Sequence, residues 1–410
     1  MANNLPDLCL QNIFKHLNYD KALYPCTLVN KQWSYSSIPV LWSNPFIYVF
    51  EGRKPLNSLK PLIDTYLSFL PQNQQEELEI KPKFNQNSIM FNYPVYIRHI
   101  FFYFIYEGVK YWCNHCNVSN IIIKERKNQI CKALIESFFI KSSKIDTFEI
   151  FESDDDDFKI SDIFGSISNI QKIQKIRTLI IAKCSDISIL LNLTLNVKSL
   201  KLFTLYNFDL VNSLRQFVQS QKNLTDITFS FPPKLFPTYW EIFHSSKTAT
   251  STVTFIEFIH IQFPKNISLI YHLALFTNLQ YLKFRACDFG YIPNIKEDQL
   301  IQEINSNYPL AFKKLNTIII IEDSYLNLEI LKILLQFSGE ELLSLELFEV
   351  KINKFNYIIK WLEVFCPNLR RLVIVDKTND KLEIVGIHDF FRKFNNLSYV
   401  IINGEKHFVT

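Results

Sequence analysis

A short apolar pattern recurs ten times in the last two thirds of the chain, and it constrains the fold more than any other feature. Each copy reads apolar, two variable residues, apolar, one variable residue, apolar. The copies begin at residues 145, 176, 197, 224, 253, 279, 315, 342, 369 and 397, so most successive starts lie 26 to 29 residues apart. Apolar residues at alternate positions predict one short strand in each copy.

Helical segments alternate with these strands. Residues 267–273, 328–335 and 358–365 place apolar side chains three and four positions apart, as the buried face of a helix does. A polar turn residue then leads back into the next strand, as Asn223 and Asn278 do. Because a unit of strand, turn, helix and turn can bury its apolar face only against copies of itself, the pattern predicts a solenoid.

The repeating pattern resembles the leucine-rich repeat, whose period is roughly 20–29 residues. Cys184 and Cys287 stand where that repeat carries Asn or Cys. The resemblance implies an α/β solenoid whose parallel strands line a concave face. Residues 97–102 would add one earlier strand, and residues 45–50 would pair at the N-terminal edge. An ordinary α/β domain with a parallel sheet is the alternative, although it accounts less well for ten similar periods.

The first part of the chain carries a purely helical pattern. Pro6 suits the first turn of a helix, where its missing N–H costs nothing. The next apolar residues are spaced along one helix face: Leu10, Ile13, Phe14 and Leu17. A short second helix is predicted around Ala22 and Leu23. The third predicted helix ends at Ile38-Pro39 and carries these apolar residues: Cys26, Val29 and Trp33.

Three helices in about forty residues are too few to bury all of their apolar groups, because small domains lie near the limit of stability. Several large apolar side chains should therefore stay exposed until a partner covers them. The segment resembles the F-box, on the following residues: Leu5-Pro6-Asp7, the stripe from Leu10 to Leu17, Leu23, the run from Val29 to Trp33, and Leu41-Trp42. Leu8 stands where many members carry Glu, and Asn30 where many carry Cys. A helical cap on the solenoid is the alternative interpretation.

The resemblance to the F-box implies binding to the Skp1 adaptor and, through it, to a cullin scaffold. The residues that would supply this contact or its support are Leu5, Pro6, Leu10, Ile13, Phe14, Leu17, Leu23, Val29 and Trp33. The chain would then comprise an F-box over residues 1–44, a bridging region with helices and irregular early repeats over residues 45–140, and a leucine-rich-repeat-like array over residues 141–410.

The resemblance to the leucine-rich repeat implies that the variable strand residues bind a target protein. The candidate residues are Arg177, Lys201, Phe203, Glu257, Tyr281, Lys283, Arg285, Arg370 and Arg371, with Glu346 on the same face. The two arginines near residue 370, beside Lys283 and Arg285, would hold an acidic or phosphorylated motif. The chain would be a substrate adaptor of an SCF-type ubiquitin ligase. The alternative is a scaffold that binds Skp1 and partners without directing ubiquitination.

Composition excludes several other classes of function. Lys and Arg number 44 against 40 Asp and Glu, which gives no general case for a nucleic acid or an anionic membrane as partner. The N-terminus lacks the pattern of a signal peptide, and the densest apolar run, residues 100–106, is far shorter than the ~20 residues that cross a bilayer. We expect a protein of the cytosol or nucleus.

Catalytic and metal-binding motifs are sparse. The seven glycines lie far apart, so neither GxGxxG nor GxxxxGK[ST] occurs, and HExxH is also absent. Cys113 and Cys116 form the one CxxC pair, which Cys131 and His99 would have to complete for zinc. We expect no metal, no cofactor and no catalytic residue, with an enzyme that uses the CxxC insert as the alternative. The acidic run 154–157 is expected to be a solvated loop, or alternatively a target-facing patch.

Overall fold

The chain forms two compact units, residues 1–195 and 196–410, in a computed structural model. The structure describes all residues except 1–4, 18–21, 51, 53, 82, 85–88, 115–119, 152–175, 183, 185–186, 192–195, 204–209, 231–235, 264–267, 290–296, 322–327, 351–354, 377–393, 395, 403–404 and 409–410. Among the described helices, none combines the length and the apolar character needed to cross a membrane.

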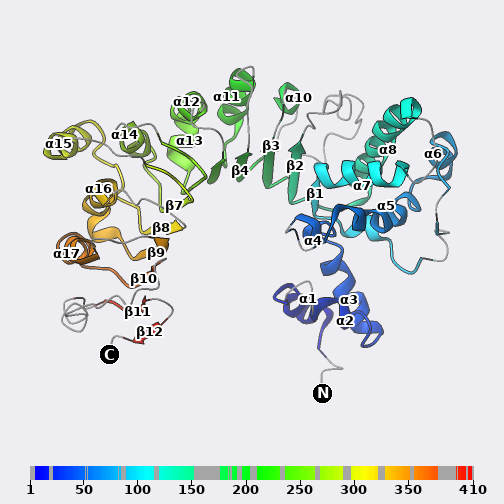
Figure 1. The fold of residues 1–410 in the computed structure, drawn as a ribbon, viewed down its shortest axis with the longest axis horizontal. Coiled ribbons are helices and arrows are strands. Elements are labelled where there is room, and N and C mark those ends of the chain that lie inside the picture. Colours follow the sequence, from blue (N-terminus) through cyan, green and yellow to red (C-terminus); the bar gives the residue numbers. More distant parts are fainter. Residues whose placement is uncertain are drawn as a thin grey trace. The chain divides into compact units, whose positions relative to one another are not determined.

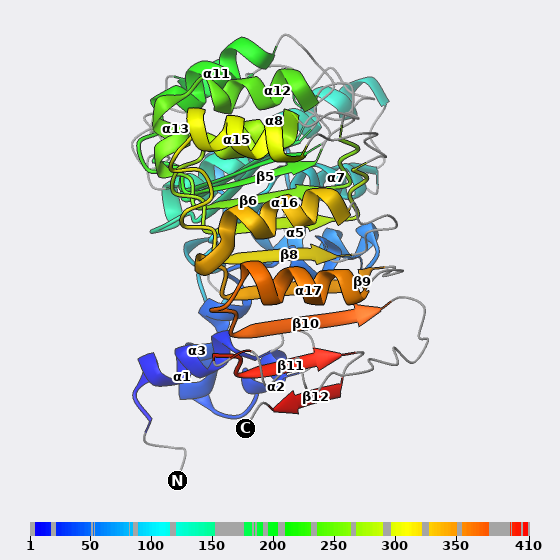
Figure 2. The ribbon, with the colours of Figure 1, turned by 90° about the vertical axis from the view of Figure 1, so that its left-hand side faces the viewer.

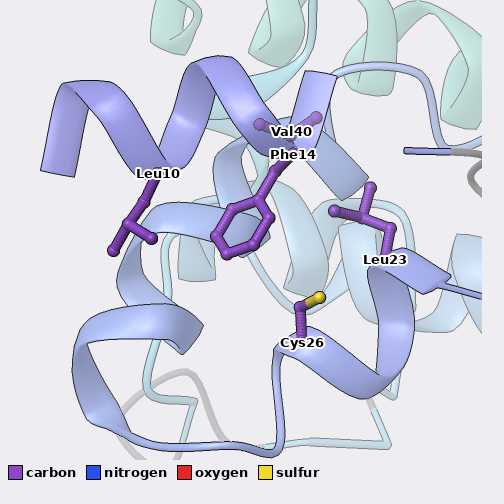
Figure 3. Packing of buried hydrophobic residues seen from close by; sticks show 5 residues of the cluster. All are labelled: Leu10, Phe14, Leu23, Cys26 and Val40. Carbon is purple, nitrogen blue, oxygen red and sulfur yellow. The ribbon is translucent and has the colours of Figure 1, made fainter. Parts of the chain in front are cut away.

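Unit 1 begins with three short helices, here called the N-terminal trio. They are α1 (Asp7–Lys15), α2 (Tyr24–Cys26) and α3 (Lys31–Leu41). Their shared core is drawn in Figure 3 and consists of Leu10, Phe14, Leu23, Cys26 and Val40. The predicted stripe of the first helix is therefore confirmed at its core positions. The ring of Phe14 also meets that of Trp33 edge to face, with centroids 5.3 Å apart.

The third helix differs from the prediction at both ends. Asn30 is its N-cap, because the Asn30 side chain accepts a hydrogen bond from the backbone N–H of Trp33 at 2.9 Å. Cys26 therefore belongs to α2, and Val29 lies in the turn before α3. Pro39 lies inside the helix, which continues to Leu41. The buried side chains of Ile38 and Val40 on this last turn offset the loss of one backbone hydrogen bond.

The rest of unit 1 combines helices with the first three strands (Figure 1). The helical elements are α4 (Ile47–Phe50), η3 (Leu56–Ser58), α5 (Leu59–Leu67), α6 (Gln72–Glu77), η5 (Tyr93–Tyr96), α7 (Phe102–Asn114), α8 (Asn120–Lys141) and α10 (Ser188–Leu191). The strands are β1 (His99–Phe101), β2 (Thr147–Phe151) and β3 (Thr178–Ala182), and they pair in parallel in that order.

The segment 45–50 was predicted to be an edge strand, and this prediction is wrong. Residues 47–50 form helix α4, which follows Phe46, a fully buried side chain whose ring stacks against that of Tyr66 at 6.5 Å. Ser43 pairs with the edge strand β1 instead. Its carbonyl accepts hydrogen bonds from the backbone N–H groups of Arg98 and His99, at 2.9 and 3.2 Å.

The same arrangement, in which one carbonyl accepts two successive backbone N–H groups, recurs between later repeats. The carbonyl of Arg98 accepts the N–H groups of Asp146 and Thr147 in the same way, and farther along the chain Thr254 accepts those of Gln280 and Tyr281. Ser43 thus takes the place that a preceding repeat would occupy. The end of the N-terminal trio is therefore joined to β1 in the register of the repeats.

Unit 2 is a run of strand and helix units in sequence order (Figure 2). Its strands are β4 (Ser199–Phe203), β5 (Asp226–Ser230), β6 (Phe255–Ile259), β7 (Tyr281–Arg285), β8 (Thr317–Ile321), β9 (Ser344–Val350), β10 (Arg371–Asp376), β11 (Tyr399–Ile402) and β12 (Glu405–Phe408). Neighbours from β4 to β11 are parallel, whereas β12 returns antiparallel to β11. All ten predicted repeat strands, and the earlier strand within 97–102, are confirmed across the two units.

The described helices of unit 2 lie on one face of its sheet and leave the other face open (Figures 1 and 2). They are α11 (Leu210–Ser220), α12 (Phe236–His244), α13 (Lys247–Thr252), α14 (Ser268–Ala274), α15 (Glu297–Asn307), α16 (Leu328–Ser338), η8 (Gly339–Glu341) and α17 (Phe355–Phe365). The three predicted helices at 267–273, 328–335 and 358–365 correspond to α14, α16 and α17. The fold is the expected one, N-terminal helices followed by an LRR-like α/β solenoid.

Strand alternation builds the core of unit 2. In strands β4 to β10 the second and fourth residues point toward the helices and are buried, as Ile256 and Phe258 are on β6. The rings of Phe229, Phe258 and Phe284 stack in consecutive repeats, with centroids 5.5 and 5.4 Å apart and planes nearly parallel. The Cys287 thiol, at the position where the leucine-rich repeat carries Asn or Cys, is buried after β7 and donates to the carbonyl of Phe258 at 3.4 Å.

Candidate interaction surfaces

The N-terminal trio leaves large apolar side chains exposed, as its small size predicts. Leu8 and Val29 are 67% and 58% exposed, and Leu28 is 71% exposed. Gln32 on α3 donates to the carbonyl of Leu5 at 2.8 Å, which holds the start of α1 next to the start of α3. We define the N-terminal apolar surface by its members: Leu5, Leu8, Ile13, Tyr24, Leu28 and Val29.

The residues predicted to contact Skp1 divide into two groups. Leu5, Pro6, Ile13 and Val29 are exposed and available to a partner, whereas Leu10, Phe14 and Leu23 are buried in the core of the trio. Leu17 and Trp33 are partly buried against that core. Sequence reasoning missed Tyr24 and Leu28. Their signal was present, since Tyr24 on α2 and Leu28 in the turn after it flank the buried Cys26, and so short a helix cannot hide every apolar side chain.

In strands β4 to β10, the first, third and fifth residues lie on the open face of unit 2. Tyr281, Lys283 and Arg285 occupy these positions on β7, and Lys201 and Phe203 occupy the third and fifth on β4. Arg370 precedes β10 and is exposed, and Arg371 opens that strand. Arg177 is exposed in the turn before β3, but it belongs to unit 1.

Glu257 organises the charges of β6 and β7. Lys283 is its register partner on β7, with Nζ 2.9 Å from Glu257 Oε1, and Arg285 Nη2 lies 3.5 Å from the same oxygen. Thr228 on β5 donates to Glu257 Oε2 at 3.5 Å. One carboxylate thus serves two cations, which leaves this group with a surplus of one positive charge. The Lys283 side chain is 19% exposed and that of Arg285 is 43% exposed, so Arg285 presents the surplus.

A second ion pair joins Arg371 on β10 to Glu346 on β9, with Nε and Oε1 3.0 Å apart. Strands β8 and β9 separate Arg371 from β7. Three strand spacings amount to about 14 Å, so the structure does not bring Arg371 beside Lys283 and Arg285 into one anion site. Sequence reasoning also missed both ion pairs. Their signal was opposite charge at related motif positions in neighbouring repeats.

The cysteines of unit 1 form no described metal site. Cys113 on α7 and Cys131 on α8 are both buried, and burial raises the pKa of the Cys131 thiol, which the neighbouring Cys113 raises further. Cys116 and the acidic run 154–157 lie outside the described residues. Among the residues that the structure describes, no group of three or more His, Cys, Asp or Glu is placed to hold a metal ion.

Comparison of the chain with known protein families finds no match, and no curated protein matches it. The two surfaces therefore have to be interpreted from their own chemistry.

Proposed function

We propose that the chain is a non-catalytic adaptor, with the N-terminal trio binding Skp1 of an SCF-type ubiquitin ligase and the solenoid binding a target protein. The observation that carries the proposal is the N-terminal apolar surface on a three-helix module whose own core is complete. Leu28 and Val29 are exposed although the trio already buries Leu10 and Phe14. Exposed apolar groups gathered on so small a module are typical of a protein interface.

The mechanism is one of proximity. The trio attaches one end of the chain to the ligase, and the open sheet face holds the target so that its lysines meet the charged conjugating enzyme at high effective concentration. The chain contributes no group to the reacting bond.

The test is binding of the purified full chain to Skp1 of its own source organism, measured by isothermal titration calorimetry. We expect Ile13→Asp and Val29→Asp each to weaken binding at least about tenfold, because each places a charge in an apolar interface. Asn12→Asp is the matched control, since it adds the same charge to an exposed polar position on α1. Thermal unfolding should be unchanged in all three variants, since these side chains are exposed.

Two outcomes would count against the proposal. If no complex with Skp1 forms at micromolar concentrations, the proposal that the N-terminal trio binds Skp1 is wrong. A complex that forms while Val29→Asp leaves the turnover of captured targets unchanged would instead favour the scaffold that does not direct ubiquitination.

A further inference from the structure

A row of five side chains crosses the open face of unit 2 at the carboxyl ends of its strands. Each is the register partner of the next, from β6 to β10: Ile259, Arg285, Ile321, Phe348 and Val375. All five are partly exposed. Each is the fifth residue of its strand, so alternation with the buried second and fourth residues places it on the open face. We call these residues the carboxyl-end row.

The row is apolar except for its one arginine. Arg285 lies between Ile259 on one side and Ile321 on the other. Lys283 is the closer partner of Glu257 and neutralises it, so Arg285 keeps a net positive charge, and its Nε has no hydrogen-bond partner among the described residues. A ligand that complements the row therefore carries apolar groups and a single negative charge.

The dimensions of the row fit an extended peptide. Four strand spacings of about 4.8 Å give a row about 19 Å long, and an extended chain covers about 3.3 Å per residue, so about six residues span it. A phosphate carries close to two negative charges at neutral pH, whereas the row offers one unneutralised cation. One carboxylate matches that charge.

We propose that the carboxyl-end row binds an extended segment of about six residues in the target protein, with apolar side chains on Ile321 and Phe348 and one Asp or Glu on Arg285. This inference rests on the proposed function only in identifying the segment as part of the adaptor's target. The carboxylate forms a charge-assisted hydrogen bond to the guanidinium, and the apolar contacts exclude water from it.

The experiment selects peptides from a random phage-displayed library on the purified full chain. We expect enrichment of peptides in which one Asp or Glu is flanked by apolar residues. Affinity for the best peptide, measured by fluorescence anisotropy, should fall by more than about tenfold for Arg285→Glu, which replaces a charge-assisted bond by repulsion. Phe348→Ser should cost a similar factor through lost apolar contact.

Matched controls lie outside the row. Lys222→Glu makes the same charge reversal in the exposed turn before β5, and Phe255→Ser makes the same loss of apolar area at the start of β6. Neither should change affinity for the selected peptide by more than about twofold, because neither residue lies in the row.

The outcomes are separable from those of the adaptor test. Selection of no peptide, or of peptides indifferent to Arg285→Glu and Phe348→Ser, would overturn the inference even if Skp1 binding is intact. Tighter binding when phosphoserine replaces the acidic residue would overturn the choice of a carboxylate. If the chain does not bind Skp1 but still selects these peptides, the inference about the carboxyl-end row stands and only the proposed role in a ubiquitin ligase is contradicted.

Discussion

At the scale of single residues, Glu149 is the most unusual group in unit 1. It lies in the middle of β2, with Phe101 and Ile180 as register partners on either side. It is 8% exposed and accepts a hydrogen bond from the backbone N–H of Tyr103, while its Oε2 has no hydrogen-bond partner among the described residues. Burial raises the pKa of the Glu149 carboxyl from 4.5 to about 7. The folded unit therefore favours the protonated acid.

This raised pKa makes the stability of unit 1 depend on pH. Below pH 4.5 the Glu149 carboxyl is mostly protonated in both the folded and the unfolded chain, so its burial carries no ionisation penalty. As the pH rises from 4.5 to about 7, Glu149 ionises more readily in the unfolded chain than in the folded one, so the free energy of unfolding falls. At pH 8 we expect Glu149→Gln to raise the free energy of unfolding by up to about 3 kcal/mol, with little effect at pH 4.5. Hydrogen exchange of unit 1 amides at both pH values measures this.

The control is Glu77→Gln on α6, which removes an exposed carboxylate from the same unit and should have little effect at either pH. Parallel pH profiles for Glu149→Gln and the unmodified chain would show that the carboxyl is not held in its acid form.

At the scale of elements, the contact between α5 and α7 depends on Gly108. A Cβ built on Gly108 would lie 2.8 Å from Cγ1 of Ile63 and 3.1 Å from Cβ of Leu59, both buried on α5. Gly108→Ala gains about 1 kcal/mol of helix propensity and forces these helices apart at a cost of about 1–3 kcal/mol. We expect a net loss in the free energy of unfolding of unit 1, measured by urea titration.

A double-mutant cycle tests the cause of that loss. Ile63→Ala makes room for the added methyl group, so Gly108→Ala should cost less in that background than in the unmodified chain. An unchanged cost would place the strain elsewhere on α7.

The elements that sequence patterns predicted well are those with a repeated apolar period. Every repeat strand followed from alternation, since residues such as Ile256 and Phe258 have to face one way to be buried. The failures lie where tertiary contacts override local preference. The aromatic run at 45–50 favours a strand by propensity, yet α4 forms there next to the buried Phe46. Pro39 marks a helix end by rule, yet packing of α3 carries the helix past it.

The candidate surfaces were only partly predictable. Alternation placed Lys283, Arg285 and Phe203 on the open face correctly. The distance between β7 and β10 follows from the number of intervening repeats, which the sequence contains, so the separation of Arg285 from Arg371 was readable in principle. The pairing of Glu257 with Lys283 was readable too, as opposite charges at the third position of neighbouring strands. The contact of Glu257 with Arg285 was not, because Arg285 reaches across diagonally and side-chain direction is set by the folded neighbours.

At the scale of the whole molecule, each repeat is held mainly by its neighbours, so damage should spread locally. Phe258 is fully buried between the rings of Phe229 and Phe284. We expect Phe258→Ala to cost about 3–5 kcal/mol and to reduce hydrogen-exchange protection most in β5, β6 and β7, with a smaller effect at β10.

Phe255→Ala, on the open face of the same strand, is the matched control and should cost much less. Protection lost equally from β4 to β11 in the Phe258 variant would mean that unit 2 opens as a single block.

The role of Ser43 in the register of the repeats has a consequence for exchanging domains between proteins. Trp42 stacks on Tyr93 with ring centroids 3.9 Å apart, and the Ser43 carbonyl serves β1. A chimera cut after residue 42 would keep the solenoid but expose Tyr93, and one cut after residue 43 would also replace the carbonyl that accepts the N–H groups at the start of β1. The boundary of the N-terminal trio therefore falls before Trp42, and a transplanted trio has to leave Trp42 and Ser43 attached to the solenoid that they came from.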